Sequence, residues 1–439
     1  MVIVLALVAL AALAVVAGLH WYVWRRLVRD TTRGPGPARR AGTALFVTGP
    51  VLTVGALVAE RSGAPFWLQR TLAWPGFLWM ALALYLLLAV LATEALRPLV
   101  NRLGRRIAPS SLDHPSPDPA ASPLGRPSRV AGGQGPGVQG AEPPGAVTAA
   151  PAPAQTPAQA PRAEEPARRL VVARLLAGAA TTAAVATVGH GTYGVLKGPR
   201  VIHVTVPLTK LPRAAHGFRI AVVSDIHLGP VLGRGFAQRV VDTVNATRPD
   251  LIAVVGDLVD GSVKDLGPAA APLAGLSARH GAYFVTGNHE YFSGAEQWIE
   301  EVRDLGLHPL QNARTELPYF DLAGVNDLQG ESEGQGPDFA RALDDRDPAR
   351  ACVLLAHQPV QIHEAVRHGV DLQLSGHTHG GQLWPGSLLA AAANPTVAGL
   401  DRYGDTQLYV SRGAGAWGPP TRVGAPSDVT VIELAATRA

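Results

Sequence analysis

Long runs of apolar residues mark the first hundred positions of the chain. Residues 1–24 (MVIVLALVALAALAVVAGLHWYVW) are apolar throughout, and two further runs follow at 41–59 and 71–96. Each run is long enough for a helix to cross a bilayer core of about 30 Å, which needs roughly 20 residues. No charge interrupts the centre of any run, so nothing indicates a transport pathway. We therefore predict that residues 1–100 form a membrane anchor with three transmembrane helices.

The composition changes at about residue 101. Residues 101–167 are rich in Pro, Ala, Gly, Ser and Gln and contain almost no bulky apolar residues, so they cannot bury enough surface to offset the entropy of ordering the chain. We predict a disordered linker over this range. Residues 168–196 form a fourth apolar segment, rich in alanine, which we predict to be a fourth transmembrane helix. The alternative is a twin-arginine-like export element.

Arginine residues are distributed unevenly around these runs. Six lie in the loop after the first run and four begin the linker, whereas the loop between the second and third runs contains only Arg61 and Arg70. By the positive-inside rule, the first loop and the linker face the cytoplasm, and the fourth helix then places residues 200–439 outside. Without that helix the domain would stay inside. Positive charges that follow the first run also favour an uncleaved span over a signal peptide.

Short strand-like runs alternate with helical spacing from residue 200 onward. FRIAVVSDIH and LIAVVGDLVD are apolar runs that lead into acidic loops, and GRGFAQRVVDTVNATRPD between them has the spacing of a helix. The segments GAYFVTGNHE, ACVLLAHQP and VDLQLSGHTHGG repeat the pattern of a strand followed by a polar loop. This alternation predicts a layered α/β domain over residues 200–439.

The net charge of +4 combines two halves of opposite sign. Residues 1–199 contain 19 Lys and Arg against 8 Asp and Glu, whereas residues 200–439 contain 19 against 26. The basic residues flank the apolar runs and serve as topology signals, so we expect no nucleic-acid partner. The single cysteine, Cys352, excludes an intrachain disulfide and a thiolate metal cluster.

Side chains that bind metals follow five of the predicted strands. They are Asp225 and His227 in SDIH, Asp257 in GDLVD, Asn288 and His289 in GNHE, His357 in AHQP, and His377 and His379 in GHTHGG. Each motif alone is more often a turn, a helix cap or a core histidine. Together they follow strand ends, where α/β folds assemble their sites. Oxygen and imidazole ligands suit Mn, Fe or Zn, and a carboxylate can bridge two such ions about 3.5–4 Å apart.

In this order, DxH, GDxxD, GNHE, a single His and GHxH resemble the motifs of the calcineurin-like metallophosphoesterase superfamily. The GGQ after GHTH and the later SRGAGAWGPP resemble its bacterial membrane-anchored branch. The resemblance covers residues 215–435 and implies a four-layer αββα sandwich, preceded here by the transmembrane helices and the linker.

The same resemblance implies a role for each residue. Asp225, His227 and His379 would hold one divalent ion, and Asn288, His357 and His377 the other. Asp257 would bridge both ions. His289 would be a general acid or transition-state stabiliser near the leaving-group oxygen. The role of Asp260, the second acid of GDLVD, stays open between a ligand and a residue that orients its neighbours.

The implied activity is hydrolysis of a phosphoester or pyrophosphate bond at the cell membrane by a multi-pass protein. A hydroxide held between the ions would attack phosphorus in line, and no covalent intermediate would form. A phospholipid or a lipid-linked pyrophosphate suits an anchored domain, and a soluble phosphodiester is equally compatible. The alternative is a catalytically silent sensor or scaffold, against which the intact ligand set argues. A hydrolase acting at carbon would need HxHxDH, which HTHGGQ lacks.

Aromatic residues flank the motifs, and two interpretations of them are open. They either line an apolar groove or pack in the core, and the second is the more common outcome for such residues. The set comprises Tyr291, Phe292, Trp298, Trp384 and Trp417.

Overall fold

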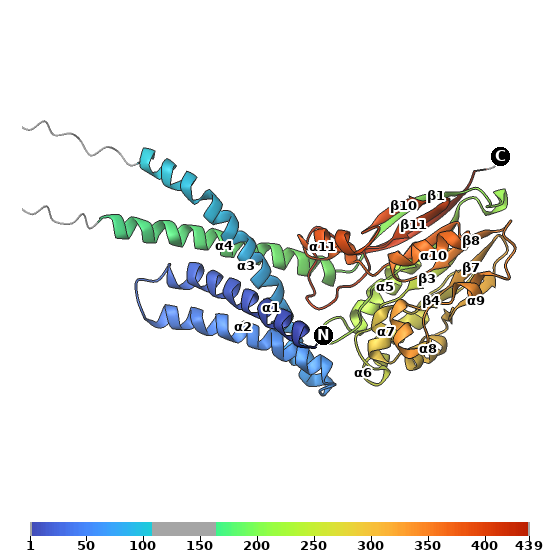
Figure 1. The fold of residues 1–439 in the computed structure, drawn as a ribbon, viewed down its shortest axis with the longest axis horizontal. Coiled ribbons are helices and arrows are strands. Elements are labelled where there is room, and N and C mark those ends of the chain that lie inside the picture. The colour runs from blue at the N-terminus through green and yellow to red at the C-terminus, as the bar shows by residue number, and fades with distance from the viewer. Residues whose placement is uncertain (1, 108–163, 438–439) are drawn as a thin grey trace, which may run out of the picture.

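The computed structural model describes residues 2–107 and 164–437 (Figure 1). A bundle of long helices occupies one side of the molecule, and a layered α/β domain occupies the other. Most of the predicted linker, residues 108–163, lies outside the described residues. Helix α3 continues past residue 101 to Ile107, and helix α4 begins at Glu164.

The bundle contains α1 (Val2–Trp24), α2 (Pro37–Arg61), α3 (Phe66–Ile107) and α4 (Glu164–Leu196). Three stretches of the described chain are long and apolar enough to cross a membrane, namely Pro37–Arg61, Phe66–Leu99 and Arg169–Leu196. Helix α1 coincides with the first apolar run of the sequence.

Aromatic packing joins the first three helices of the bundle. The rings of His20, Phe46 and Trp79 lie with their centroids 5.2 to 5.8 Å apart. Arg26, in the π-helical turn η1 (Arg25–Arg29) that follows α1, forms an ion pair with Glu94 of α3 at 3.2 Å. These contacts join segments that are far apart in the sequence.

Two six-stranded sheets form the centre of the α/β domain. In spatial order, the first contains β1 (Arg200–Leu208), β12 (Asp428–Ala436), β2 (Phe218–Val223), β3 (Leu251–Val255), β4 (Ala282–Val285) and β5 (His308–Pro309). The second contains β10 (Gly399–Tyr403), β11 (Thr406–Val410), β9 (Leu372–Ser375), β8 (Ala351–Leu355), β7 (Phe320–Gly324) and β6 (Ala313–Glu316). Both sheets are mixed: β2, β3 and β4 run parallel, whereas β12 is antiparallel to β2.

Side chains alternate between the two faces of each sheet. On β2, Ala221 and Val223 face the helices outside, whereas Ile220 and Val222 face the second sheet. Every residue of β3 (LIAVV) is buried because both of its faces are covered, which explains why the strand is a continuous apolar run.

Helices cover the outer faces of both sheets. On the first sheet lie α5 (Arg234–Ala246), α6 (Val263–Ala270) and α8 (Ala295–Asp304), and on the second lie α9 (Phe339–Leu343) and α10 (Ile362–Arg367). Two short helices, α7 (Asn288–Ser293) and α11 (Gly386–Ala393), complete the domain. The predicted αββα sandwich is confirmed.

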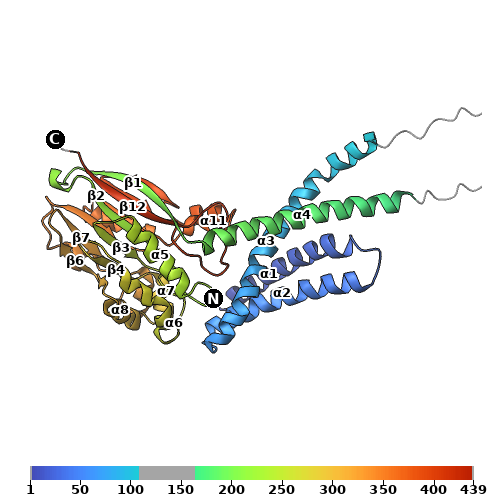
Figure 2. The same ribbon diagram turned by 180° about the vertical axis from the view of Figure 1, so that it is seen from behind.

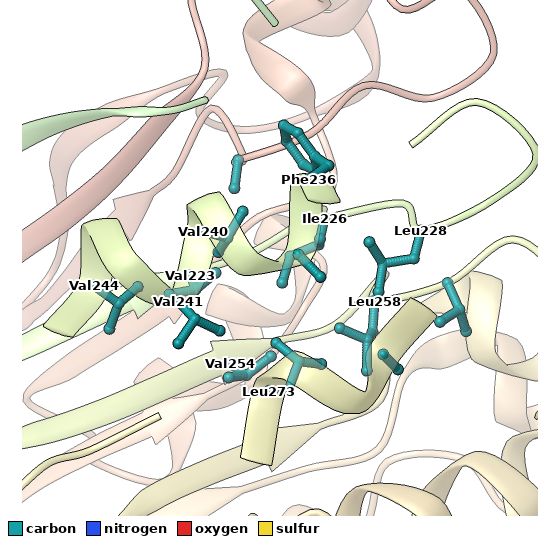
Figure 3. Packing of buried hydrophobic residues seen from close by; sticks show 14 of the residues in the cluster. Val223, Ile226, Leu228, Phe236, Val240, Val241, Val244, Val254, Leu258 and Leu273 are labelled. Carbon is teal, nitrogen blue, oxygen red and sulfur yellow. The ribbon is translucent and has the colours of Figure 1, made fainter. Parts of the chain in front are cut away.

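The valines of α5 show how one outer layer is held. Figure 3 shows Val240, Val241 and Val244 among the buried side chains that include Val223 and Val254 of the sheet. Their spacing places them on one face of the helix. Burying a valine side chain contributes about 1.5 kcal/mol or more to stability.

The flanking aromatic residues divide between the two interpretations. Trp298 and Tyr291 are buried, and the Trp298 indole donates a hydrogen bond of 2.8 Å to the Gly261 carbonyl. Phe292, Trp384 and Trp417 are exposed. The core interpretation therefore holds for the first two residues only.

The bundle and the α/β domain are in contact. Helix α4 leads almost directly into β1, and α11 lies close to α4 in both views (Figures 1 and 2). The Tyr85 hydroxyl of α3 donates to the Trp384 carbonyl at 2.9 Å, and the hydroxyls of Thr192 and Thr421 lie 2.7 Å apart. Phe66, at the start of α3, packs against the core of the first sheet. The helical bundle thus packs directly on the α/β domain.

Candidate metal centre

The structure brings the predicted ligands together at one edge of the two sheets. They lie in the loops that follow β2, β3, β4, β8 and β9, after the last residue of each strand. The loops after β2 and β3 stay paired beyond the strands, because the amide of Asp225 donates to the Gly256 carbonyl and that of His227 to the Asp257 carbonyl. The two sheets therefore present their polar loops to a common site.

One group of donor atoms contains Asp225, His227, Asp257 and His379, whose ligand atoms all lie within 4.8 Å of one another. The Nε2 atoms of His227 and His379 are 3.0 Å apart, and His379 Nε2 is 3.3 Å from Asp225 Oδ1. All four residues are buried.

A second group contains Asp257, His357 and His377. His357 Nε2 lies 3.2 Å from Asp257 Oδ2, and His377 Nδ1 lies 3.0 Å from Asn288 Oδ1. Asp257 belongs to both groups, which is the position of a bridging ligand.

Two histidines each present one ring nitrogen to the other predicted ligands, an arrangement that fits divalent cations. His357 Nδ1 donates to the Val255 carbonyl at 2.9 Å, whereas its buried Nε2 makes no hydrogen bond among the described residues. His227 Nδ1 is likewise held by Asp260, so its Nε2 faces His379. Metal-binding histidines commonly have this arrangement, with one ring nitrogen fixed by an acceptor and the other left for the ion.

The charges around the site also favour the binding of cations. Burial and the neighbouring His227 and Arg422 lower the pKa of His379, and burial and His357 lower the pKa of His377 to about 4. Both are therefore neutral imidazoles, the form that binds metals. Burial lowers the pKa of His357 as well, but the charge of Asp257 outweighs it and raises the pKa. The buried carboxylate thus requires a positive charge beside it.

Asp260 connects His227 to His289. Its Oδ1 lies 3.0 Å from His227 Nδ1 and 2.7 Å from His289 Nδ1. Burial lowers the pKa of His289, but the hydrogen bond and charge of Asp260 outweigh it and raise the pKa to about 9. His289 therefore carries a proton at neutral pH, and Asp260 orients both rings.

The backbone at the site lies in a conformation that few residues other than glycine adopt. The φ angles are 52° at Asp225, 49° at His227, 52° at Asp257, 71° at His377 and 52° at His379. This left-handed conformation costs roughly 1–2 kcal/mol for a residue with a side chain. Such strain is concentrated at functional sites, where the surrounding fold must impose it.

Comparison with known proteins agrees with this geometry. Residues 218–381 match the family model for calcineurin-like phosphoesterases. An uncharacterized metallophosphoesterase of Aquifex aeolicus is 35% identical over 240 residues, which cover 54% of this chain and 91% of that protein. The chain belongs to the calcineurin-like phosphoesterase family.

Two further family members are longer than the matched region. A "Transmembrane protein with metallophosphoesterase domain" of Danio rerio is 39% identical over 259 residues, which cover 56% of this chain and 59% of that protein. An uncharacterized metallophosphoesterase of Helicobacter pylori is 37% identical over 248 residues, which cover 56% of this chain and 66% of that protein. The chain therefore spans less than two thirds of each of these relatives. The prediction of a metallophosphoesterase with intact metal-binding residues is confirmed.

Two glycines of the phosphoesterase motifs are required by close approach. A Cβ at Gly376, before the first His of GHTH, would overlap Ser224 Oγ and the Asp225 carboxylate. A Cβ at Gly287, before Asn288, would overlap the Asp257 carboxylate. The loops pass so close to the ligands that no larger residue fits at either position.

Two buried residues of the phosphoesterase site were not predicted from the sequence. The Glu290 carboxylate accepts hydrogen bonds from the amides of Asp257, Leu258 and Gly287, and burial followed by the charge of Asp257 raises its pKa to about 7. The only sequence feature that could have identified Glu290 is its position as the last residue of the GNHE motif. Arg422 donates to the carbonyl of His379 and lies 3.1 Å from its Nδ1. No sequence motif marks this arginine.

Proposed function

We propose that the protein is a membrane-anchored phosphohydrolase that uses two divalent metal ions to cleave phosphoester or pyrophosphate bonds. The observation that carries this proposal is that Asp257 belongs to two groups of donor atoms, in which every residue except the half-buried His377 is buried. A single ion would not require seven ligands from five loops, whereas two ions that share one carboxylate do.

Each ligand has a place in this proposal. Asp225, His227 and His379 hold one ion together with Asp257, and Asn288, His357 and His377 hold the other with the same carboxylate. Their oxygen and nitrogen donors suit Mn, Fe or Zn. When bound, such ions activate water as a nucleophile at neutral pH and neutralise charge on the phosphoryl oxygens.

His289 and Asp260 supply the proton for the leaving group. Asp260 holds His289 Nδ1 at 2.7 Å and raises the pKa of the ring, so the ring stays protonated. The Nε2–H is then available to donate to the oxygen that leaves phosphorus. General acid catalysis of this kind contributes roughly 10²- to 10⁴-fold in rate.

We propose four membrane spans, three within residues 1–100 and one at 168–196, with residues 200–439 outside the cell and a linker between. The support is the distribution of arginine, since six arginines lie in the loop that follows the first apolar run, and the connection between α1 and α2 lies at the end of the bundle opposite the α/β domain (Figure 1). In intact cells, an impermeant thiol reagent should label Arg367→Cys. Labelling that requires lysis would place the domain inside.

A phospholipid or a lipid-linked pyrophosphate is the substrate class that suits an anchored site. The GGQ and SRGAGAWGPP segments support a place in the bacterial membrane-anchored branch, although the matched relatives include animal and bacterial proteins. The residue types at the metal centre do not indicate whether the substrate is a phosphomonoester or a phosphodiester. Surrogate substrates of both kinds are therefore needed to distinguish them.

The test uses the full chain in detergent, stripped of metal and reloaded with Mn²⁺. Hydrolysis of bis-p-nitrophenyl phosphate is compared with that of p-nitrophenyl phosphate. We expect turnover that Asp257→Asn abolishes, that His289→Ala lowers by roughly 10²-fold or more, and that the exposed His203→Ala leaves unchanged. Metal-loaded protein that is silent on both surrogates and on lipid phosphoesters would instead support a sensor or scaffold.

A further inference from the structure

Helix α11 is an apolar helix of the catalytic domain that buries none of its residues among the described parts of the chain. Its sequence is GSLLAAAA, and residues 383–393 contain no charged side chain. Leu388 is 69% exposed and Leu389 is 77% exposed, the two largest values among the large apolar side chains described. A surface helix of a water-soluble domain normally buries its apolar face.

The segment that leads into α11 is fixed to the part of the anchor that is apolar enough to span the membrane. The Tyr85 hydroxyl donates to the Trp384 carbonyl at 2.9 Å, and Tyr85 lies within the stretch Phe66–Leu99. At 1.5 Å per residue, Tyr85 is about 21 Å along the helix from Leu99. Leu383 also packs against the buried cluster of the bundle. The start of α11 therefore lies at the depth of the bilayer.

The loops beside α11 satisfy their own polar groups, as a segment in lipid must. The Trp384 amide donates to the Val423 carbonyl at 2.9 Å. The Gln382 side chain donates to the carbonyls of Trp417 and Pro419, and its oxygen accepts from the Trp417 amide. These loops can thus sit beside acyl chains without leaving these polar groups unpaired.

The same segment is continuous with the metal centre. The turn η6 (His379–Gly381) ends three residues before Trp384 and contains the proposed metal ligand His379. Beside the site, the exposed rings of Phe292 and Trp417 lie 5.5 and 5.6 Å from the His289 ring. Two exposed aromatic rings therefore lie beside His289, and Trp417 is joined through Gln382 to the segment that leads into α11.

The anchor also borders the site on a second side. Val231, in the loop between β2 and α5, packs against the cluster formed by Ala56, Ala73 and Phe77 of α2 and α3. The end of α2 and the first part of α3 thus pack against the loop that carries Asp225 and His227.

We propose that residues 383–393, including α11, are embedded in the outer leaflet of the bilayer, and that the metal centre receives an amphiphilic phosphoester laterally from that leaflet. The occupant of the α11 surface is the acyl region of the lipid, because the surface is uncharged and fixed to a spanning helix. The embedding rests on the geometry and on the proposed membrane spans, and the choice of the outer leaflet rests on the proposed topology. The choice of substrate rests on the proposed function.

Fluorescence quenching in proteoliposomes tests the embedding. The native Cys352 is buried and burial raises its pKa to about 12, so an introduced cysteine is the reactive one. An environment-sensitive fluorophore is attached to the cysteine of full-length Leu388→Cys protein. The Leu389→Cys variant provides a second labelling position. Arg367→Cys is the control, because the Arg367 side chain is also 69% exposed but lies on α10, over the second sheet.

Vesicles of phosphatidylcholine and phosphatidylglycerol carry nitroxides on their acyl chains, and iodide is the aqueous quencher. We expect nitroxide to quench the Leu388→Cys label at least several-fold more strongly than the Arg367→Cys label, and iodide to show the opposite order. Equal access of iodide to both labels would overturn the embedding. Exclusion of both quenchers from position 388, together with concentration-dependent crosslinking, would assign the surface to a second copy of the chain.

Substrate choice is tested with the double substitution Leu388→Ser and Leu389→Ser. The ratio of kcat/KM for a long-chain phosphodiester in vesicles to that for a short-chain analogue in solution is expected to fall about tenfold, through KM. An unchanged ratio would contradict lateral access. Wild-type protein that turns over neither substrate would contradict the proposed function and lateral access together, while the quenching result would still decide the embedding.

Discussion

At the scale of single residues, the site depends on acids that hold other side chains in place. Asp260 binds the Nδ1 atoms of His227 and His289 and so directs the opposite nitrogens toward the centre. The sequence identified the metal ligands because each follows a strand end in a recognisable motif. It could not assign Asp260, Glu290 or Arg422, because their roles depend on contacts with residues in other loops.

Asp260→Asn should therefore lower the rate more than the metal content. The amide oxygen can still accept from both rings, but the amide carries no negative charge to raise the pKa of His289, so we expect kcat to fall roughly 10- to 100-fold. Steady-state kinetics and metal analysis of the same sample check this. Asp265→Asn, on the exposed side of α6, is the matched control. Wild-type kcat in Asp260→Asn would refute the role in proton donation.

Glu290→Ala should lower stability, because three buried amides lose their acceptor. Each unsatisfied buried group costs about 1–3 kcal/mol, so the loss should exceed 3 kcal/mol unless water enters. Glu290→Gln should cost less, since it keeps one acceptor oxygen. Denaturant midpoints of the full chain in detergent measure the difference, with the exposed Glu296→Gln as reference. A Glu290→Ala midpoint equal to wild type would show that the carboxylate is dispensable.

At the scale of elements, the strands were predictable and the turns after them were not. Burial on both faces makes β3 a continuous apolar run, which the sequence shows directly. The left-handed conformation of Asp225 and His379 leaves no such pattern, because the fold around these residues imposes it. Helix α11 escaped prediction for a related reason: the domain buries none of its side chains, so no apolar periodicity marks it.

Gly376→Ala tests the close approach of two of these turns. The added Cβ would overlap Ser224 Oγ and the Asp225 carboxylate, which displaces the loop that carries His377 and His379. We expect Mn²⁺ affinity to fall at least tenfold, measured by calorimetric titration. Gly233→Ala, where a Cβ meets nothing within 4 Å, serves as the control. An unchanged Mn²⁺ affinity in Gly376→Ala would show that the site still binds metal when the loop with His377 and His379 moves away from the loop with Ser224 and Asp225.

At the scale of the whole molecule, the anchor and the catalytic domain form one structure. The apolar runs predicted the long apolar helices, but the docking of the bundle on the domain could not be predicted from the sequence. The bond from Tyr85 to Trp384 joins residues 299 positions apart, and neither residue signals the other. Bound metal should stabilise this assembly, because the ligands come from loops of both sheets.

Removing metal should therefore lower the melting temperature of the full chain. Ions present at 1,000 times their dissociation constant stabilise the native state by about 4 kcal/mol, provided that the unfolded chain does not bind them. Thermal melts with chelator and with added Mn²⁺ measure this, and Asp257→Asn should respond much less than wild type. A melting temperature that is independent of metal would contradict an ion-dependent site.

The central claim is that Asp257 joins two metal ions in one site. Metal analysis of full-length protein after Mn²⁺ loading and removal of free ion tests it most directly. We predict two ions per chain in the wild type and in His203→Ala, and fewer than one in Asp257→Asn, because that carboxylate belongs to both donor groups. A wild-type chain that binds a single ion, or an Asp257→Asn chain that retains two, would contradict the account.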